Sequence, residues 1–140
     1  MIIRPVTPQE YSGELWQVYR QLVGEALEHA YRDDDYTAKV DYAFERGQCL
    51  GMVVEDNDEP IAFGVVETIT TKKGKYLNLW TLAGERSDEW LDDYIYHCEI
   101  VARREGLKGL MLGGRTGWSR KLRPRGFKET AVIMTKELPE

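Results

Sequence analysis

The sequence predicts an α/β (α+β) fold in which a mixed, mostly antiparallel central sheet is flanked by helices. Two observations predict it. Between residues 49 and 82, three apolar and β-branched segments are separated by short turn-forming stretches, which is typical of consecutive antiparallel strands. Residues 88–105 then repeat apolar side chains at helical spacing, and a short apolar segment follows at 107–112. A strand, a helix and a strand in this order indicate parallel pairing through a crossover.

The length and composition favour one domain over residues 1–140. A chain of 140 residues, 42% of them apolar, buries about two-thirds of its unfolded surface, which is enough for one core. No apolar run approaches the roughly 20 residues of a membrane helix, so no membrane partner is expected. The N-terminus lacks a basic segment followed by an apolar one. We therefore expect a reducing, cytoplasmic location.

Local signals place the elements along the chain. Thr7, Pro8 and Glu10 have the spacing of a capping box, with Pro8 at the first helical position. The expected helices cover residues 7–29, 36–46, 88–105 and 116–122. The expected strands cover residues 1–6, 49–55, 61–71, 76–82, 107–112 and 127–138.

Neither the two cysteines nor the three consecutive aspartates have the spacing of a metal-binding site. Cys49 and Cys98 lie far apart without a nearby Cys or His at metal-ligand spacing, and we expect both to be small buried hydrophobes. The run 33–35, three consecutive aspartates, is interpreted as a solvated connection. No metal is therefore expected.

The element order over nearly the whole chain resembles that of the GNAT acyl-CoA N-acyltransferase superfamily. Residues 117–128, GWSRKLRPRGFK, look like that family's last short helix, with Gly126-Phe127 opening the strand behind it. Residues 132–138, VIMTKEL, are similar to the family's final strand. The Gly-Trp before the helix and the Lys-Glu-Leu near the end also look like small phage-encoded GNAT-like proteins.

The resemblance implies a place for acetyl-CoA. In GNAT enzymes the strands corresponding to 76–82 and 107–112 splay apart, pantetheine pairs with the exposed backbone, and the pyrophosphate lies at the N-terminus of the following helix. The implied cofactor-binding residues are Leu82, Ala83, Gly84, Arg86 and Ser87.

The sequence departs from the family's pyrophosphate loop. The family pattern is Gln or Arg, two residues, Gly, one residue, and Gly or Ala, whereas here only Gly84 and Arg86 can serve. Ser87 is expected to be the N-cap of the helix, which places Asp88 and Glu89 in its first turn. These carboxylates complement the helix dipole themselves and oppose a second anion. A degenerate phosphate loop on an ordinary capped helix is the prediction.

Candidate catalytic groups are Glu67 and Asn78. The family often places a general-acid tyrosine four residues before the Gly-Phe pair, where this chain has Leu122, which cannot transfer a proton. Glu67 is the one carboxylate within the strand 61–71, and a solvated position on the sheet surface is the alternative interpretation. Asn78 is polar amid an apolar strand. His29 is expected near the end of the first helix and His97 beside the buried stripe of the long helix.

Basic residues are concentrated before the C-terminus, although the chain carries 19 basic and 24 acidic residues and a net charge of −5. The basic patch consists of Arg115, Arg120, Lys121, Arg123 and Arg125. It is interpreted as a solvated charge run, a site for the 3′-phosphate of CoA, or a surface for an acidic protein partner, a virion component or a nucleic-acid backbone. Trp118 and Phe127 lie within or beside it and could stack on a ligand.

Two functions therefore remain open. The first is an acyl-CoA-dependent N-acyltransferase that acts on a small amine or a protein amine, mostly by orienting the reactants. The second is a non-catalytic binding protein or a phage-type virion-associated protein on a GNAT scaffold, found in the host cytoplasm or the virion. Fold alone does not decide between them.

Overall fold

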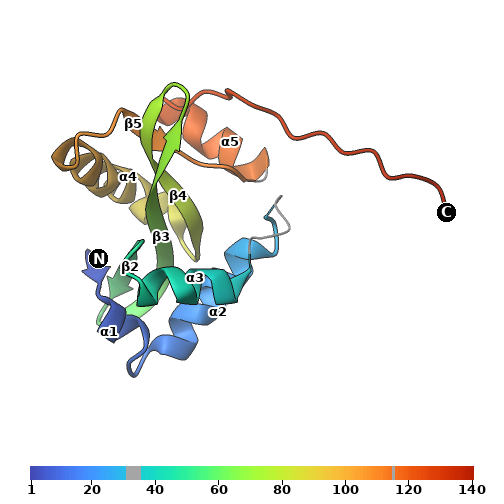
Figure 1. The fold of residues 1–140 in the computed structure, drawn as a ribbon. Coiled ribbons are helices and arrows are strands. Elements are labelled where there is room, and N and C mark those ends of the chain that lie inside the picture. The colour runs from blue at the N-terminus through green and yellow to red at the C-terminus, as the bar shows by residue number, and fades with distance from the viewer. Residues whose placement is uncertain (31–35, 115) are drawn as a thin grey trace.

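The computed structural model describes residues 1–30, 36–114 and 116–140, and Figure 1 shows their arrangement. The strands are β1 (Ile2–Val6), β2 (Leu50–Asp56), β3 (Glu59–Thr71), β4 (Gly74–Gly84) and β5 (Gly109–Met111). The helices are α1 (Pro8–Tyr11), α2 (Trp16–Leu27), α3 (Thr37–Glu45), α4 (Ser87–Arg104) and α5 (Thr116–Leu122), and the 3₁₀ turn Arg123–Arg125 follows. The aspartate run 33–35 and Arg115 of the basic patch lie outside the described residues.

The five strands form one sheet in the order β1-β2-β3-β4-β5. The antiparallel β2–β3 and β3–β4 pairings and the parallel β4–β5 pairing agree with the sequence prediction. β1 pairs with β2, also antiparallel, which the sequence did not indicate. Asn57 and Asp58 both adopt positive φ, 51° and 66°, in the turn that joins β2 to β3. This is the backbone of a two-residue hairpin, which Asn and Asp tolerate better than other non-glycine residues.

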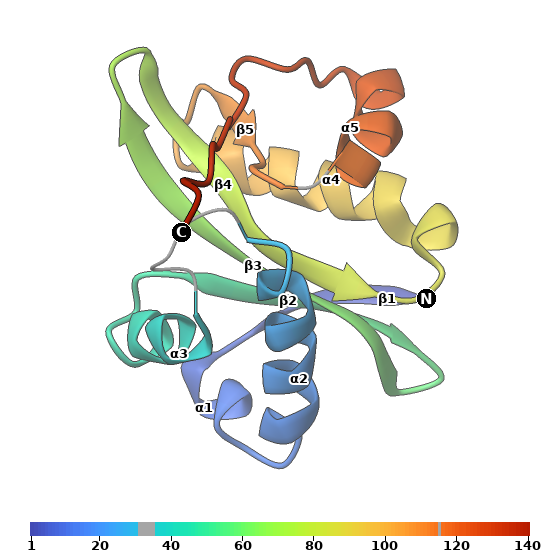
Figure 2. The same ribbon diagram turned by 90° about the vertical axis from the view of Figure 1, so that its right-hand side faces the viewer.

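Helices cover both faces of the sheet. Figure 2 shows α1, α2 and α3 on one side and α4 and α5 on the other. On the first side Tyr19, Phe44 and Phe63 form a buried aromatic cluster, in which the rings of Tyr19 and Phe63 lie 4.6 Å apart. On the second side Trp90 and Tyr94 of α4 pack on the sheet. Cys98 is buried on this side and Cys49 is half-buried, which agrees with their interpretation as small core residues.

The first predicted helix is divided in two. The expected continuous helix from residue 7 to about 29 is wrong, because α1 ends at Tyr11 and α2 starts at Trp16. Ser12 and Gly13 fall in the break, and the Ser12 hydroxyl donates to the Pro8 carbonyl at 2.8 Å. Serine side chains compete for backbone groups in this way and glycine has low helix propensity, so the chain turns here.

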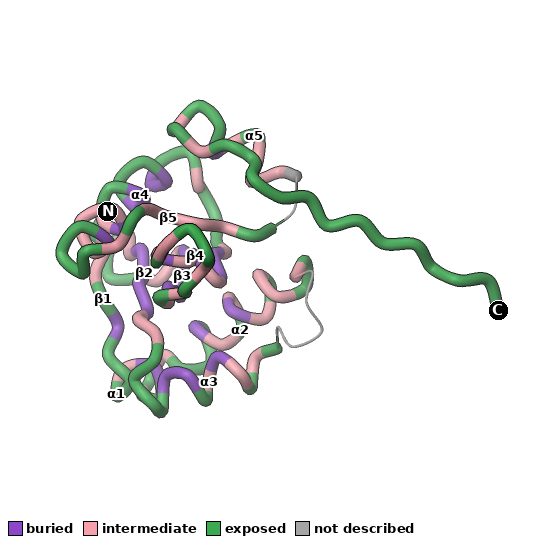
Figure 3. The backbone as a smooth tube through the Cα atoms, turned by 45° about the horizontal axis from the view of Figure 1, so that its top comes forward, coloured by how far each residue is buried: buried purple, intermediate pink, exposed green. Residues whose placement is uncertain are grey.

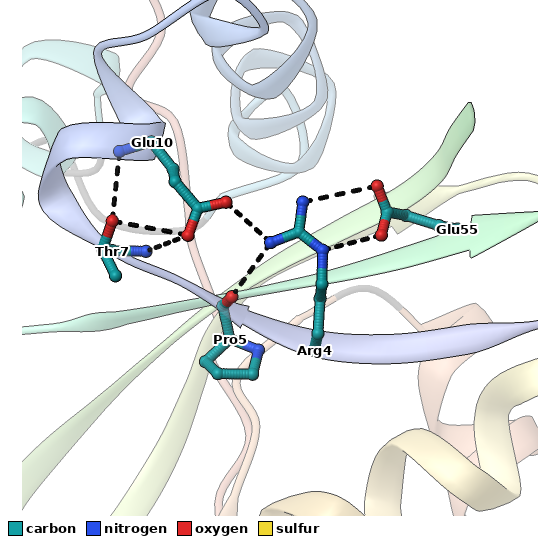
Figure 4. A network of polar contacts seen from close by, with 5 residues as sticks. All are labelled: Arg4, Pro5, Thr7, Glu10 and Glu55. Carbon is teal, nitrogen blue, oxygen red and sulfur yellow. Dashed lines mark hydrogen bonds and ion pairs between the residues drawn. The ribbon is translucent and has the colours of Figure 1, made fainter. Parts of the chain in front are cut away.

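The predicted capping box is confirmed. The Glu10 backbone N–H donates to the Thr7 hydroxyl at 3.2 Å, and the Glu10 carboxylate accepts from the Thr7 backbone N–H at 3.4 Å. Arg4 on β1 joins this cap to β2, with its Nη1 2.7 Å from Glu10 and its Nε 2.7 Å from Glu55 (Figure 4). The network ties two neighbouring strands to the first helical turn.

The final strand expected over residues 127–138 is wrong. Residues 126–140 have no regular secondary structure, and the segment extends away from the rest of the molecule (Figure 1). It is exposed from residue 128 to residue 140 (Figure 3). Phe127, half-buried against the α4 side of the core, is the last residue of the chain that packs on it. An alternating apolar pattern needs a neighbouring strand to form a ladder, and nothing in the described chain pairs with this one.

No helix in the described parts of the chain combines the length and apolar character needed to span a bilayer.

Candidate functional site

The sheet splits between β4 and β5. The parallel pairing joins only Tyr76–Asn78 to Gly109–Met111. β4 continues to Gly84, whereas the chain after Met111 leaves toward α5. The pairing of β4 with β3 also shifts register here, from Val66 opposite Leu79 to Val65 opposite Thr81, so Trp80 is an extra residue in β4. Such a bulge bends its strand, and it lies two residues after the last pairing with β5.

A cavity of about 290 Å³ occupies this split. Its walls are the second half of β4, the start of α4, the segment 112–114 with α5, and the C-terminal end of α2. Residues 79–84 of β4 have a strand neighbour only on the β3 side in the described structure. An extended ligand in this cavity would therefore lie along a strand edge that has backbone groups to offer.

Positive charge gathers where the cavity meets α4. Lys121 of α5 reaches across and its ammonium donates to the Ser87 hydroxyl at the first turn of α4. The same ammonium lies 5.9 Å from the centre of the Trp118 ring. Among the described residues no side chain caps this helix by a hydrogen bond. The positive end of the helix dipole and the lysine together favour an anion at this end.

The N-cap is Arg86 and not Ser87, which corrects the sequence-based assignment. Arg86 adopts a left-handed conformation, φ 60° and ψ 38°, and Ser87 is the first helical residue. The Arg86 guanidinium binds Glu89 at 2.6 Å and Asp56 at 2.8 Å. These hydrogen bonds hold the pKa of both carboxyls below their ordinary values.

This pairing changes the role of Glu89, one of the two acids in the first turn; the other, Asp88, is exposed. Because Arg86 neutralises Glu89, this acid does not confront an anion at the helix end as the sequence alone suggested. Leu82, Ala83, Gly84 and Ser87, which the resemblance implied as cofactor-binding residues, line the cavity. Arg86 is directed to its two carboxylate partners instead.

Gly84 allows β4 to approach β3 closely at the edge of the cavity. Its φ is +152°, and a Cβ placed on it would collide with Ala62 and with the Ile61 carbonyl oxygen. The next N–H, that of Glu85, donates to the Ile61 carbonyl at 3.0 Å. The Trp90 indole donates to the Glu85 carbonyl at 2.7 Å. The loop before α4 is therefore fixed from both sides, and only glycine fits at position 84.

The structure brings Glu67 and Asn78 together but outside the cavity. They are direct partners on β3 and β4, and Asn78 Nδ2 donates to Glu67 Oε1 at 3.1 Å. Neither side chain lines the cavity, although Leu79, the next residue of β4, does. Burial, with a smaller contribution from the Glu67 charge, raises the pKa of the half-buried Cys49 thiol to about 12.

The wall of the cavity opposite α4 carries three polar residues that the sequence analysis did not assign to the site. Glu25, Glu28 and His29 come from the C-terminal end of α2, and all three are exposed. The sequence placed His29 near a helix end, but no local signal indicated which part of the sheet that end faces. His97 lies elsewhere, half-buried on α4, with Nδ1 2.7 Å from the Asp93 carbonyl oxygen.

The basic patch is partly neutralised. Arg123 pairs with Glu129 at 2.7 Å and Arg125 with Asp92 at 2.6 Å. Among the patch residues that the structure describes, Lys121 lines the cavity. Arg115 lies outside the described residues. Leu122 is only 4% exposed and packs in the core beneath α4 and α5.

Three of the solved structures similar to this chain are described as acetyltransferases. A predicted acetyltransferase with acetyl-CoA from Clostridium acetobutylicum has a TM-score of 0.72 at 12% identity, covering 97% of this chain and 95% of that one. An aminoglycoside acetyltransferase from an uncultured soil metagenomic sample has a TM-score of 0.70 at 12% identity, covering 99% and 98%. A GCN5-related N-acetyltransferase from Ralstonia eutropha JMP134 has a TM-score of 0.69 at 16% identity, covering 98% and 97%.

The chain has the GNAT fold. At these identities the likeness shows the fold alone, and the fold agrees with the resemblance found in the sequence. No protein-family model matches the sequence, and a search of curated proteins gave no match. In the GNAT fold of this chain, the split between β4 and β5 and the start of α4 form the candidate site.

Proposed function

We propose that this protein is an acyl-CoA-dependent N-acyltransferase. The observation that carries the proposal is the cavity between the diverging strands, which has Lys121 and the start of α4 at one end and carboxylates at the other. The similar structure with acetyl-CoA supports this choice of cofactor. The two ends differ in charge, as expected for a site that takes an anionic cofactor and a cationic amine.

The residues present fit acetyl-CoA in two places. The edge of β4 at residues 81–84, which has a strand neighbour only on the β3 side in the described structure, offers backbone groups to the amide-rich pantetheine arm. Ser87, Lys121 and the free N–H groups at the start of α4 would hold the diphosphate. Bound there, acetyl-CoA supplies an activated thioester. Arg86 contributes indirectly, because it neutralises the nearby acids.

The acceptor amine would approach from the α2 side. Glu25 and Glu28 would attract and orient an ammonium group, and His29 would take up a proton as the amine becomes nucleophilic. Much of the rate acceleration would come from holding two reactants in one cavity. Glu67, held by Asn78, would act on the proton through water or keep β3 and β4 aligned beside the split.

Titration calorimetry with acetyl-CoA tests the binding part of this proposal. We expect binding by the wild type and about tenfold weaker binding by Lys121→Met, because one charge-assisted hydrogen bond is worth about 1.5–3 kcal/mol. Arg103→Met, an exposed change at the far end of α4, is the matched control and should bind as the wild type does. Absence of heat and of any shift in melting temperature at a cofactor concentration of roughly 1 mM would exclude the proposal, since KM values seldom exceed that level.

A thiol-release assay with diamines, polyamines and lysine peptides tests the transfer part. His29→Asn should lower kcat by about 10²-fold if it is the proton acceptor, whereas Glu67→Gln should do so if that carboxylate acts through water. Lys136→Gln, in the exposed C-terminal segment, is the control. No product with any amine would reject transferase activity even where acetyl-CoA binds.

The alternative is a binding protein that keeps the GNAT scaffold without transfer. It is favoured by Leu122, buried where many relatives are expected to carry a general acid, and by the engagement of Arg86 with its own acids. An acidic protein partner or a virion component would then meet the remaining basic patch. Binding of acetyl-CoA without turnover would support this alternative. Detection of the chain at fixed copy number in purified particles would support its virion form.

A further inference from the structure

The outer edge of β5 has backbone groups ready for another strand. β5 is the last strand of the sheet, and no strand covers its outer side in the described structure. The Lys108 N–H donates to the Lys75 carbonyl on β4 at 2.8 Å. Because backbone groups alternate in direction along a strand, Gly109 and Met111 point their N–H and C=O groups outward. Open edges of this kind are templates for strand addition.

The C-terminal tail, residues 130–140, has the sequence of the missing strand. Its apolar side chains are far more exposed than is usual for their type: Val132 72%, Ile133 60%, Met134 89% and Leu138 82%. Val132 and Ile133 are β-branched and the segment contains no proline before residue 139. Nine residues of extended chain span about 30 Å, more than the roughly 20 Å of β5 and its flanks at 107–112. The tail is long enough to cover this edge.

The start of the tail directs it away from its own sheet. The Glu129 carboxylate accepts from the Ser119 hydroxyl at 2.6 Å and from Arg123 at 2.7 Å. The Phe127 N–H donates to the Leu122 carbonyl at 3.2 Å. These contacts fasten the chain to α5, and beyond them the tail extends outward from the molecule (Figures 1 and 3). A tail held in this direction is presented to a neighbouring molecule.

We propose that the tail of each chain pairs with the β5 edge of a second copy, in a two-fold dimer that exchanges its C-terminal strands. A second copy is the partner that the structure favours, because each chain carries both an exposed strand and an open edge, and one symmetric exchange completes both. Val132, Ile133, Met134 and Leu138 leave solvent in the exchange, and the outward groups of Gly109 and Met111 gain hydrogen bonds.

Light scattering coupled to size-exclusion chromatography, over about a hundredfold range of protein concentration, tests the exchange. We expect a dimer for the wild type and a monomer for the chain lacking residues 130–140. Ile133→Lys should weaken the dimer at least tenfold, because it places a charge in a buried position. Lys136→Gln is the control of matched position and should stay dimeric. A wild type that is monomeric throughout, or a dimer that survives the deletion, overturns the proposal.

Mixing two variants separates the tail from the edge. Met111→Pro removes an outward N–H and leaves the β4 ladder intact, and circular dichroism verifies that the variant is folded. Met111→Pro keeps its tail, and the tail-deleted chain keeps its edge. Each alone should be monomeric, and a mixture should form heterodimers. If the tail instead folds back on its own β5, tail amides will be protected from hydrogen exchange in a monomer, which rejects the second copy as partner.

Discussion

The first turns of α1 and α4 are both rich in polar groups, but the side chains at the two helix ends bind different partners. At α1 the Thr7 hydroxyl and the Glu10 carboxylate satisfy backbone donors, and Arg4 holds Glu10 in place. At α4 the arginine at the cap turns back to Glu89 and Asp56, and the cation that faces the cavity comes from α5. The first helix end is capped by its own side chains, whereas no side-chain hydrogen bond caps the second in the described structure.

This contrast supports the proposal that a helix with acids in its first turn can still hold an anion. Glu10 completes a cap, and removing it would expose backbone donors to water. Glu89 completes an ion pair with Arg86, which removes its charge from the neighbourhood of Ser87. The partner of each glutamate, and not its position in the helix, decides its effect on ligand binding.

The largest change expected at the α4 end comes from Gly84→Ala. Its Cβ would collide with the backbone of β3, so we expect a loss of about 2–4 kcal/mol in the free energy of unfolding. Urea denaturation measures it. Gly106→Ala is the matched control, because Gly106 also has positive φ, 69°, but a Cβ there meets open space, and about 1 kcal/mol should be lost. Equal losses would show that the approach to β3 is not the constraint.

Arg86→Met tests the role of this residue as a neutraliser. Removing the guanidinium leaves the Glu89 and Asp56 charges uncompensated, and we expect acetyl-CoA to bind about three- to tenfold more weakly. Calorimetry at low and high salt measures the effect, which should shrink as salt screens the charges. An unchanged affinity at low salt would mean that these acids do not act on the cavity.

At the α1 end, Thr7→Ala should cost about 1 kcal/mol of stability and leave acetyl-CoA binding unchanged. For a chain of this length the melting temperature should fall by about 3 °C, as scanning calorimetry would show. Ser12→Ala, one turn later, is the control. A change in cofactor affinity on Thr7→Ala would contradict the separation of the two helix ends.

The smallest expected effect is on pH dependence. The hydrogen bond from Arg4 lowers the pKa of Glu10, so this carboxylate stabilises the fold above its ordinary unfolded value of 4.5. That contribution is lost as pH falls below 4.5 through the folded pKa. Thermal melts from neutral to acid pH should therefore show a shallower decline for Arg4→Met than for the wild type. Parallel curves would indicate that the Arg4–Glu10 pair contributes nothing.

The sheet and the long helix were predictable from the sequence because their signals are local. The turn residues between β2 and β3 and the apolar stripe of α4 indicate structure within a few residues. The break between α1 and α2 was not predicted, although Ser12 and Gly13 mark it, because the apolar stripe continues across them. The tail was assigned to a strand because its apolar side chains are spaced as in a strand. Such spacing does not show whether a neighbouring strand is present to pair with it.

The site was less accessible from the sequence than the fold. Gly84 and Ser87 were predicted from their place before α4, and both line the cavity. Lys121 reaches Ser87 across 34 residues of chain, and His29 faces the cavity from a helix on the other side of the sheet. Such contacts depend on how elements far apart in the sequence pack together. The spacing of residues within the sequence gives no information on this packing.

The extra residue at Trp80 lies two residues beyond the end of the β4–β5 pairing, where the cavity begins. With this additional residue, β4 pairs with β3 along its length but with β5 only over Tyr76–Asn78. Deleting that position would restore the regular alternation of β4 side chains. We expect β5 then to pair with β4 over a longer stretch and to narrow the space between β4 and α5. The opening in this protein is therefore encoded by the length of one strand relative to the strand beside it.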